Sequence, residues 1–182
     1  MKTLYIASDI HGGFASIDRL WQIIDQDKGK KRVILLGDTY NHGPRNPFPE
    51  EYAPMEVEAL LESKIGEFDV IKGNCDSEVD QMISPFKIRG DFSLKDGDRH
   101  IFFTHGHKVN PDMPSKKAKV GDVVLYGHFH VPCHTIVDGV HYICVGSISM
   151  PKDGSKHTYA IYNNSTVTVK ALDGTTVLEI KL

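Results

Sequence analysis

Five short apolar runs in this chain each end in polar residues of the kinds that bind metal ions. The runs have the length and composition of β-strands, and helix-like or loop segments separate them. They cover residues 4–7, 33–36, 70–71, 101–103 and 123–126. Open sheets of α/β proteins bind ligands at the carboxyl ends of their strands, where loops converge. We therefore expect the polar residues at these strand ends to form one site.

The polar residues that follow the runs carry carboxylate, imidazole or amide groups. There are seven of them: Asp9, His11, Asp38, Asn74, His105, His128 and His130. Imidazoles combined with carboxylate and amide oxygens suit Mn, Fe, Zn or Ni, whereas an all-oxygen site suits Ca or Mg. A single tetrahedral zinc takes only four ligands, so the set fits two ions that share a bridging carboxylate. Two ions about 3.5–4 Å apart can bind the attacking and leaving oxygens of a displacement at phosphorus.

The spacing within two of the clusters is also informative. Asp9 and His11 are two residues apart, and so are His128 and His130. Alternate side chains of an extended segment point to the same side. We therefore expect both members of each pair to face the site from extended backbone.

The segments between the runs predict helices and hairpins. Ile17, Leu20, Trp21 and Ile24 recur at helical spacing, which predicts a helix over residues 14–27 with its apolar face in the core. Further helices are expected over 55–65 and 77–83, and a strand over 86–94. Short turn signals predict hairpins, most of them in a largely antiparallel C-terminal part, at residues 96–98, 138–139, 163–164 and 173–174.

Length and charge bound the class of protein. A chain of 182 residues with 40% hydrophobic and 25% charged residues predicts a single globular domain, residues 1–182. A net charge of −3 provides no general attraction to nucleic acid. No apolar run approaches the ~18 residues that span a membrane, and residues 4–7 are too short for a signal peptide. We therefore expect neither nucleic acid nor a membrane as partner, and leave a homo-oligomer open.

Cysteine usage bears on the compartment. Cys75, Cys133 and Cys144 are odd in number and include no Cys-x-x-Cys pair. The pattern fits neither a disulfide framework nor a thiolate zinc site, and it suits a reducing environment. A cytoplasmic location is expected.

The five clusters together resemble a known family. Read in order, Asp-Ile-His, Gly-Asp, Gly-Asn-Cys-Asp, His-Gly-His and Gly-His-Phe-His are similar to the motifs of the calcineurin-like metallophosphoesterases, over residues 9–130. The segments 41–46 and 73–82 resemble most closely the YfcE-type bacterial phosphodiesterases. The resemblance implies a four-layer αββα sandwich of two mixed β-sheets flanked by helices. It also implies hydrolysis of a small phosphodiester by a metal-bridging hydroxide.

The same resemblance implies a role for each candidate ligand. Two divalent ions are expected per chain, most simply Mn(II), with Ni, Co, Fe or Zn as the other candidates. Asp38 would bridge the two ions. One ion would be held by Asp9, His11 and His130, and the other by Asn74, His105 and His128.

One position departs from the family pattern. Many relatives have a His after the Gly-Asn pair, where its imidazole can protonate the leaving group, and this chain has Cys75. A thiol of pKa near ~8.5 is a poorer acid–base group at neutral pH than an imidazole near ~6.5. We favour a packing role for Cys75, and keep a catalytic role and a redox-sensitive thiolate as alternatives. Asp76 is expected to cap the following helix or to orient a ligand.

Three further residues are candidates for substrate contacts. The proline-rich loop 39–54 leaves a ligand-bearing strand and contains His42 and Arg45, and Arg45 could bind a phosphate through two hydrogen bonds. His107 lies two residues beyond His105 and could reach a ligand or the phosphate. The segment 146–151 is expected only to pack.

Three rival functions share the fold implied by the resemblance. A phosphomonoesterase of the protein-phosphatase type would have Arg in Gly-Asp-x-x-Asp-Arg-Gly, and this chain has His42 there. A nuclease would need added DNA-binding elements, for which an acidic chain of this length has little room. A non-enzymatic module of the retromer-subunit type has an impaired metal site, whereas all seven candidate ligands occur here.

Overall fold

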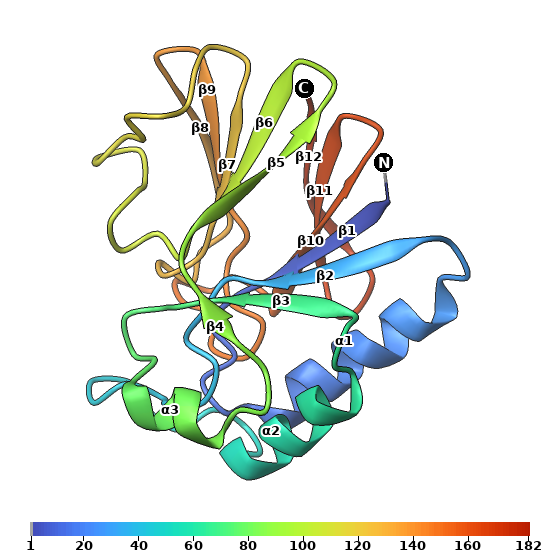
Figure 1. Ribbon diagram of the computed structural model, residues 1–182, viewed down its shortest axis with the longest axis vertical. Helices are drawn as coiled ribbons and strands as arrows, with labels where there is room; N and C mark the ends of the chain where they lie inside the picture. The colour runs from blue at the N-terminus through green and yellow to red at the C-terminus, as the bar shows by residue number, and fades with distance from the viewer. Residues whose placement is uncertain (1) are drawn as a thin grey trace.

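Two mixed β-sheets pack face to face in the computed structural model, which describes residues 2–182 (Figure 1). The larger sheet has the strand order β12 (Thr176–Lys181), β11 (Thr166–Ala171), β10 (Thr158–Asn163), β1 (Thr3–Ala7), β2 (Lys31–Leu35), β3 (Phe68–Ile71) and β4 (Ile88–Arg89). The smaller has the order β5 (Phe92–Asp96), β6 (Arg99–Phe103), β7 (Val123–Tyr126), β9 (Val140–Cys144) and β8 (Cys133–Val137). The predicted pair of mixed sheets is confirmed.

Strand β1 shows why the first apolar run is continuous. Its side chains alternate, so that Leu4 and Ile6 join the core between the two sheets while Tyr5 and Ala7 join the core beneath the helices. Because successive residues of a strand point to opposite faces, a strand covered on both sides must be apolar throughout.

The helices lie together on the outer side of the larger sheet (Figure 1). They are α1 (Phe14–Gln26), α2 (Pro54–Ser63) and α3 (Glu78–Ile83). The apolar face predicted for α1 is fully buried against the sheet. The helix ends one residue before the predicted boundary, because Asp27 has extended backbone and accepts a hydrogen bond from Tyr5 Oη at 3.0 Å.

The outer face of the smaller sheet is covered differently. Within residues 2–182 no helix packs there, and Val109 and Ala118 of the irregular segment 104–122 cover Val124 and Tyr142 instead. Pro111 and Pro114 interrupt this segment, and proline disfavours a helix interior. The fourth layer of the sandwich is therefore a loop.

The strand predicted over residues 86–94 is in fact two strands. β4 pairs with β3 in the larger sheet, and β5 pairs with β6 in the smaller one. The chain crosses between the sheets at Gly90 and Asp91. The hairpin after β5 forms as predicted, as do those between β8 and β9 and among β10, β11 and β12.

The topology brings five strand ends to one place. β1, β2 and β3 are mutually parallel, and so are β6 and β7. Their carboxyl ends therefore meet at one edge of the sandwich, where the two sheets join.

In the part of the chain that is described, no helix is both long and apolar enough to cross a membrane.

Candidate metal centre

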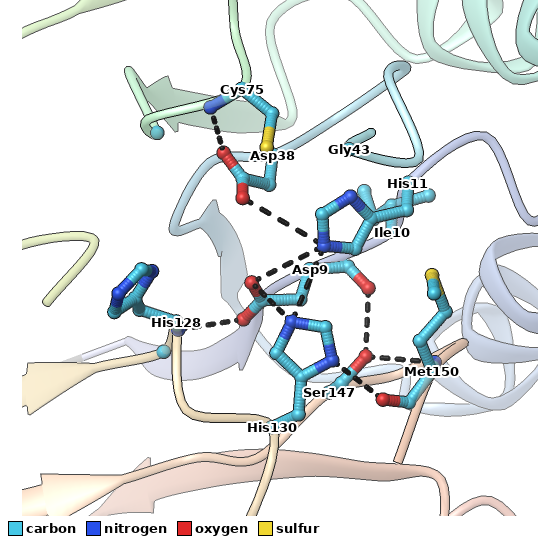
Figure 2. A network of polar contacts seen from close by, with 12 residues as sticks. Asp9, Ile10, His11, Asp38, Gly43, Cys75, His128, His130, Ser147 and Met150 are labelled. Carbon is cyan, nitrogen blue, oxygen red and sulfur yellow. Dashed lines mark hydrogen bonds and ion pairs between the residues drawn. The ribbon is translucent and has the colours of Figure 1, made fainter. Parts of the chain in front are cut away.

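The loops after β1, β2 and β7 bring two carboxylates and two imidazoles together (Figure 2). His11 Nε2 lies 3.6 Å from Asp9 Oδ1 and 3.7 Å from Asp38 Oδ2. His130 Nε2 lies 3.3 Å from the same Asp9 oxygen. Asp9, His11 and His130 are buried, and their three ligand atoms lie within 4.8 Å of one another.

A second group of ligand atoms adjoins the first across Asp38. His105 Nε2 lies 3.3 Å from Asp38 Oδ2 and 3.0 Å from Asn74 Oδ1. The His128 ring follows, with its centroid 5.2 Å from that of His105. Asp38 Oδ2 thus lies close to a histidine of each group, which is where a bridging carboxylate would lie.

The orientation of three of these histidines is set by backbone carbonyls. His11 Nδ1 donates to Asn41 O at 2.6 Å, His105 Nδ1 to Leu36 O at 2.7 Å, and His130 Nδ1 to Met150 O at 2.6 Å. A carbonyl only accepts, so the proton of each neutral ring lies on Nδ1 and Nε2 carries a lone pair. Metal-binding histidines are commonly oriented in this way.

The nitrogen and oxygen lone pairs that point into the centre have no hydrogen-bond donor between them, so a cation could bind there. His11 Nε2 and His130 Nε2 face each other at 3.3 Å. Asp9 Oδ1 is buried and has no hydrogen-bond partner among the described residues. Acceptors packed against acceptors are costly unless a positive charge lies between them. The donor set therefore fits divalent ions with a preference for imidazole and carboxylate.

Without such ions, protons supply the positive charge. Burial lowers the pKa of His105, but the contact with Asp38 and the charges of Asp9 and Asp38 outweigh this effect and raise it to about 9. Burial likewise raises the pKa of Asp9, yet His11 and His130 bring it well below its ordinary value. The pKa of His128 is lowered by burial and by the charge of His105. The centre thus stabilises positive charge between its carboxylates.

Most of the candidate ligands have left-handed backbone. The φ angles are 57° at Asp9, 48° at His11, 54° at Asp38, 68° at His128 and 65° at His130. This region is sparsely populated for residues other than glycine and is enriched at functional sites. Both members of each spaced pair face the site as predicted, but tight turns bring them there instead of the expected extended segment.

Two glycines allow these loops to approach the carboxylates. A Cβ on Gly127 would collide with Ser8 Oγ and come within 2.6 Å of Asp9 Oδ2, and one on Gly73 would collide with Asp38. The neighbouring amides use the space, since His128 N donates to Asp9 Oδ2 at 2.9 Å and Cys75 N to Asp38 Oδ1 at 2.8 Å. These hydrogen bonds hold both carboxylates in place.

Asp76 joins the loops after β2 and β3. Its buried carboxylate accepts hydrogen bonds from the amides of Asp38 and Thr39 at 2.8 Å and from Gly73 at 2.7 Å. The cap of α3 is Ser77, in a capping box with Asp80. Of the two roles expected for Asp76, helix capping is wrong, and its contacts orient the segment that carries Asp38.

The segment 146–151, expected only to pack, also shapes the site. Ser147 Oγ donates to Asp9 O at 2.8 Å, and Met150 O orients His130 (Figure 2). Ser149 Oγ also donates to Asp9 O, at 3.0 Å. The two serine contacts join residues 138 and 140 positions apart. No local pattern in the sequence signals them, because serines are common in turns.

A cavity of about 650 Å³ opens in front of the centre. Arg45, the candidate for a phosphate contact, lines it, and so does Lys152, which no motif in the sequence had indicated. His42 does not line it and packs instead on Phe48 and Tyr52, with ring centroids 4.4 and 5.5 Å away. His107 does not line it either, and its ring centroid lies 5.4 Å from that of His105.

Cys75 also lines this cavity, beside Asp38. Its thiol accepts from Asn74 Nδ2 at 3.2 Å, and its ligand atom lies within 4.8 Å of those of His11 and Asp38. Burial and the charge of Asp38 raise the pKa of the thiol to about 12. In the absence of metal the thiol is therefore neutral at physiological pH.

Comparison with known proteins identifies the family. The sequence model of the calcineurin-like phosphoesterase superfamily domain matches residues 1–166. The chain belongs to that superfamily. Its family membership makes it a metal-dependent phosphoesterase. The candidate metal centre lies at the strand ends that carry the family motifs.

Two relatives show how far the similarity extends. The chain is 36% identical over 181 residues to phosphodiesterase YfcE of Escherichia coli, covering 98% of this chain and 96% of that protein. The solved structure of E. coli YfcE superimposes with a TM-score of 0.92, at 34% identity and 98% coverage of both chains. The probable metallophosphoesterase YsnB of Bacillus subtilis is 30% identical over 114 residues, covering 58% of this chain and 63% of that protein.

A more distant likeness concerns the fold alone. The zinc complex of Vps29 from Entamoeba histolytica superimposes with a TM-score of 0.60 at 17% identity, covering 98% of both chains. The superimposed residues define the same arrangement of two sheets.

Proposed function

We propose that this chain is a phosphodiesterase that works with two divalent metal ions. The position of Asp38 carries the proposal, because its Oδ2 lies close to both His11 Nε2 and His105 Nε2, at 3.7 and 3.3 Å. A carboxylate between two groups of lone pairs suits a bridge between two ions. The near full-length similarity to a protein named as a phosphodiesterase supports the choice of a diester.

In this proposal the candidate ligands keep the roles implied by the resemblance. Asp9, His11 and His130 would hold one ion, Asn74, His105 and His128 would hold the other, and Asp38 would be shared by both. The mixture of imidazole and oxygen ligands favours Mn(II), with Ni, Co, Fe and Zn as alternatives. The three cysteines are all free thiols, which supports a reducing compartment and a cytoplasmic location.

The chain's own residues then position the substrate. Two divalent ions would supply a hydroxide nucleophile near neutral pH and neutralise charge that develops on the phosphate. Arg45 and Lys152, which line the cavity from two different loops, hold the phosphate through charge-assisted hydrogen bonds. Asp76 and Ser147 keep Asp38 and Asp9 in place through the contacts described above.

The proposal is tested by metal analysis combined with a substrate panel. Purified protein, stripped with a chelator and reloaded with Mn, Mg, Ni, Co or Zn, is assayed on phosphate monoesters and diesters. We expect diester hydrolysis that chelation abolishes and Mn(II) restores better than Mg(II), because imidazole binds transition ions more strongly. Preference for monoesters would instead favour a phosphomonoesterase. Absence of bound metal and of any hydrolysis would favour an interaction module.

A further inference from the structure

A second cavity adjoins the metal centre and has a different chemistry. It measures about 350 Å³, and its walls include Pro47, Phe48, Pro49 and Pro151. It shares Asn46 and Lys152 with the metal-centre cavity. None of the seven candidate ligands lines it. A group bound there would lie beside the reacting phosphate and away from the ligands.

Phe48 is the exposed feature of this cavity. Phe48 is 65% exposed, although its ring contacts two other rings. The His42 ring lies 4.4 Å away at an interplanar angle of 39°, and the Tyr52 ring lies 4.7 Å away at 41°. The Phe48 ring thus packs on two neighbouring rings and is still largely exposed, so it offers a surface on which another planar ring can stack.

Two basic side chains line the neighbouring cavity, where the phosphate would bind. Lys152 lies where the two cavities meet, and Arg45 lines the metal-centre cavity. The Lys152 amide also donates to His130 O at 3.4 Å, which links this boundary to the loop of a candidate ligand. A phosphodiester held by Arg45 and Lys152 would therefore have one substituent directed along Lys152 toward Phe48.

We propose that the Phe48 cavity binds a planar aromatic substituent of the phosphodiester, the one that stays on phosphorus. In an in-line displacement the leaving group departs along the axis of attack, and the retained substituent lies to its side. A side cavity that opens from the metal-centre cavity at Asn46 and Lys152 can hold this lateral substituent. This inference rests on the proposed function and names the substrate class as diesters that carry a planar ring.

The experiment compares diesters with the same leaving group. Bis(4-nitrophenyl) phosphate and thymidine 5′-(4-nitrophenyl) phosphate retain a ring, whereas methyl 4-nitrophenyl phosphate retains only a methyl group. Because stacking on an aromatic side chain is strong, Phe48→Ala should lower kcat/KM by about 5- to 100-fold for at least one ring-retaining diester. It should change the rate on the methyl ester less than about 2-fold. The relative losses on the two ring-bearing esters distinguish a simple aryl group from a nucleobase.

Matched variants separate stacking from packing. Phe48→Leu keeps apolar bulk without a planar ring and should behave like Phe48→Ala, whereas Phe48→Trp should retain the preference. Ile136→Ala, which removes a 55% exposed apolar side chain on β8, should leave all three rates unchanged. Equal effects of Phe48→Ala on all three esters, or no effect on any, would overturn the proposal.

A binding measurement gives a readout without turnover. The metal-loaded protein is titrated by calorimetry with phenylphosphonate and with methylphosphonate, whose P–C bonds are not hydrolysed. Phe48→Ala should weaken binding of phenylphosphonate only, and an unchanged ratio of the two affinities would overturn the proposed subsite. If wild type hydrolysed no diester at all, the proposed function would fail, while this titration would still decide whether the Phe48 cavity binds a ring.

Discussion

At the scale of single residues, Cys75 distinguishes this chain from many relatives. The thiol lines the cavity at a position where the family pattern has an imidazole. A thiol, with an ordinary pKa of about 8.5, is a poorer proton donor at neutral pH for a departing alkoxide than an imidazole, with an ordinary pKa of about 6.5. We infer that the chain relies on leaving groups that depart unaided or take a proton from solvent.

Substitutions at Cys75 test this inference. Cys75→Ala should retain activity on nitrophenyl diesters within about 10-fold, and Cys75→His should raise rates on alkyl diesters more than on nitrophenyl diesters, since general acid catalysis contributes about 10²–10⁴-fold. Steady-state kinetics on both substrate types gives the comparison. Loss of activity in Cys75→Ala as complete as that of a ligand variant would show that the thiol itself binds metal or reacts.

At the scale of elements, the strands could be predicted more fully than the loops they carry. The apolar runs predicted the main strand ends, and the spacing of apolar residues predicted α1. Both predictions succeed because the buried face of a strand or helix leaves a local pattern of apolar residues in the sequence. The left-handed turns at Asp9 and Asp38 were not predicted, since the residues in the left-handed region are aspartates and not glycines. The contact from Ser147 to Asp9 depends on how the two sheets pack, so it leaves no trace in either local sequence.

The close packing of these loops makes a glycine prediction. Gly127→Ala should destabilise the protein by about 1–3 kcal/mol and weaken metal binding, because its Cβ would displace Ser8 and the Asp9 carboxylate. Gly90→Ala is the matched control, since a Cβ there meets nothing within 4 Å. Denaturant unfolding and metal titration of both variants provide the measurement. A Gly127→Ala protein that binds metal as tightly as wild type would show that the loop can move away without cost.

At the scale of the whole molecule, metal and protons compete for the same buried centre. The pKa of His105 is raised to about 9 from an ordinary value near ~6.5. A group whose pKa is higher in the folded state adds stability that is complete below the unfolded value and is lost as pH rises through the folded value. The metal-free protein should therefore lose stability between about pH 6.5 and 9.

The metal-loaded protein should show the opposite trend over the same range. Imidazoles must be deprotonated to bind metal, so metal stabilisation increases as pH rises. Thermal unfolding with chelator and with excess Mn(II), at several pH values from about 6 to 9.5, tests both trends, and each kcal/mol corresponds to about 2–4 °C in Tm for a domain of this size. If the Tm of the metal-free protein rose steadily across this pH range, protonated His105 would not be what stabilises the metal-free centre.

The most direct test of the binuclear centre is the metal content of an Asp38 variant. Wild-type protein reloaded with Mn(II) should contain about two ions per chain by elemental analysis. Asp38→Asn keeps the size of the side chain but removes the bridging charge. This variant should lose at least one ion per chain. Its activity should fall by more than about 10–100-fold, the loss typical of residues that only support a ligand. His130→Ala should lose one ion, as a one-site control. Two ions per chain and near-normal activity in Asp38→Asn would contradict the account.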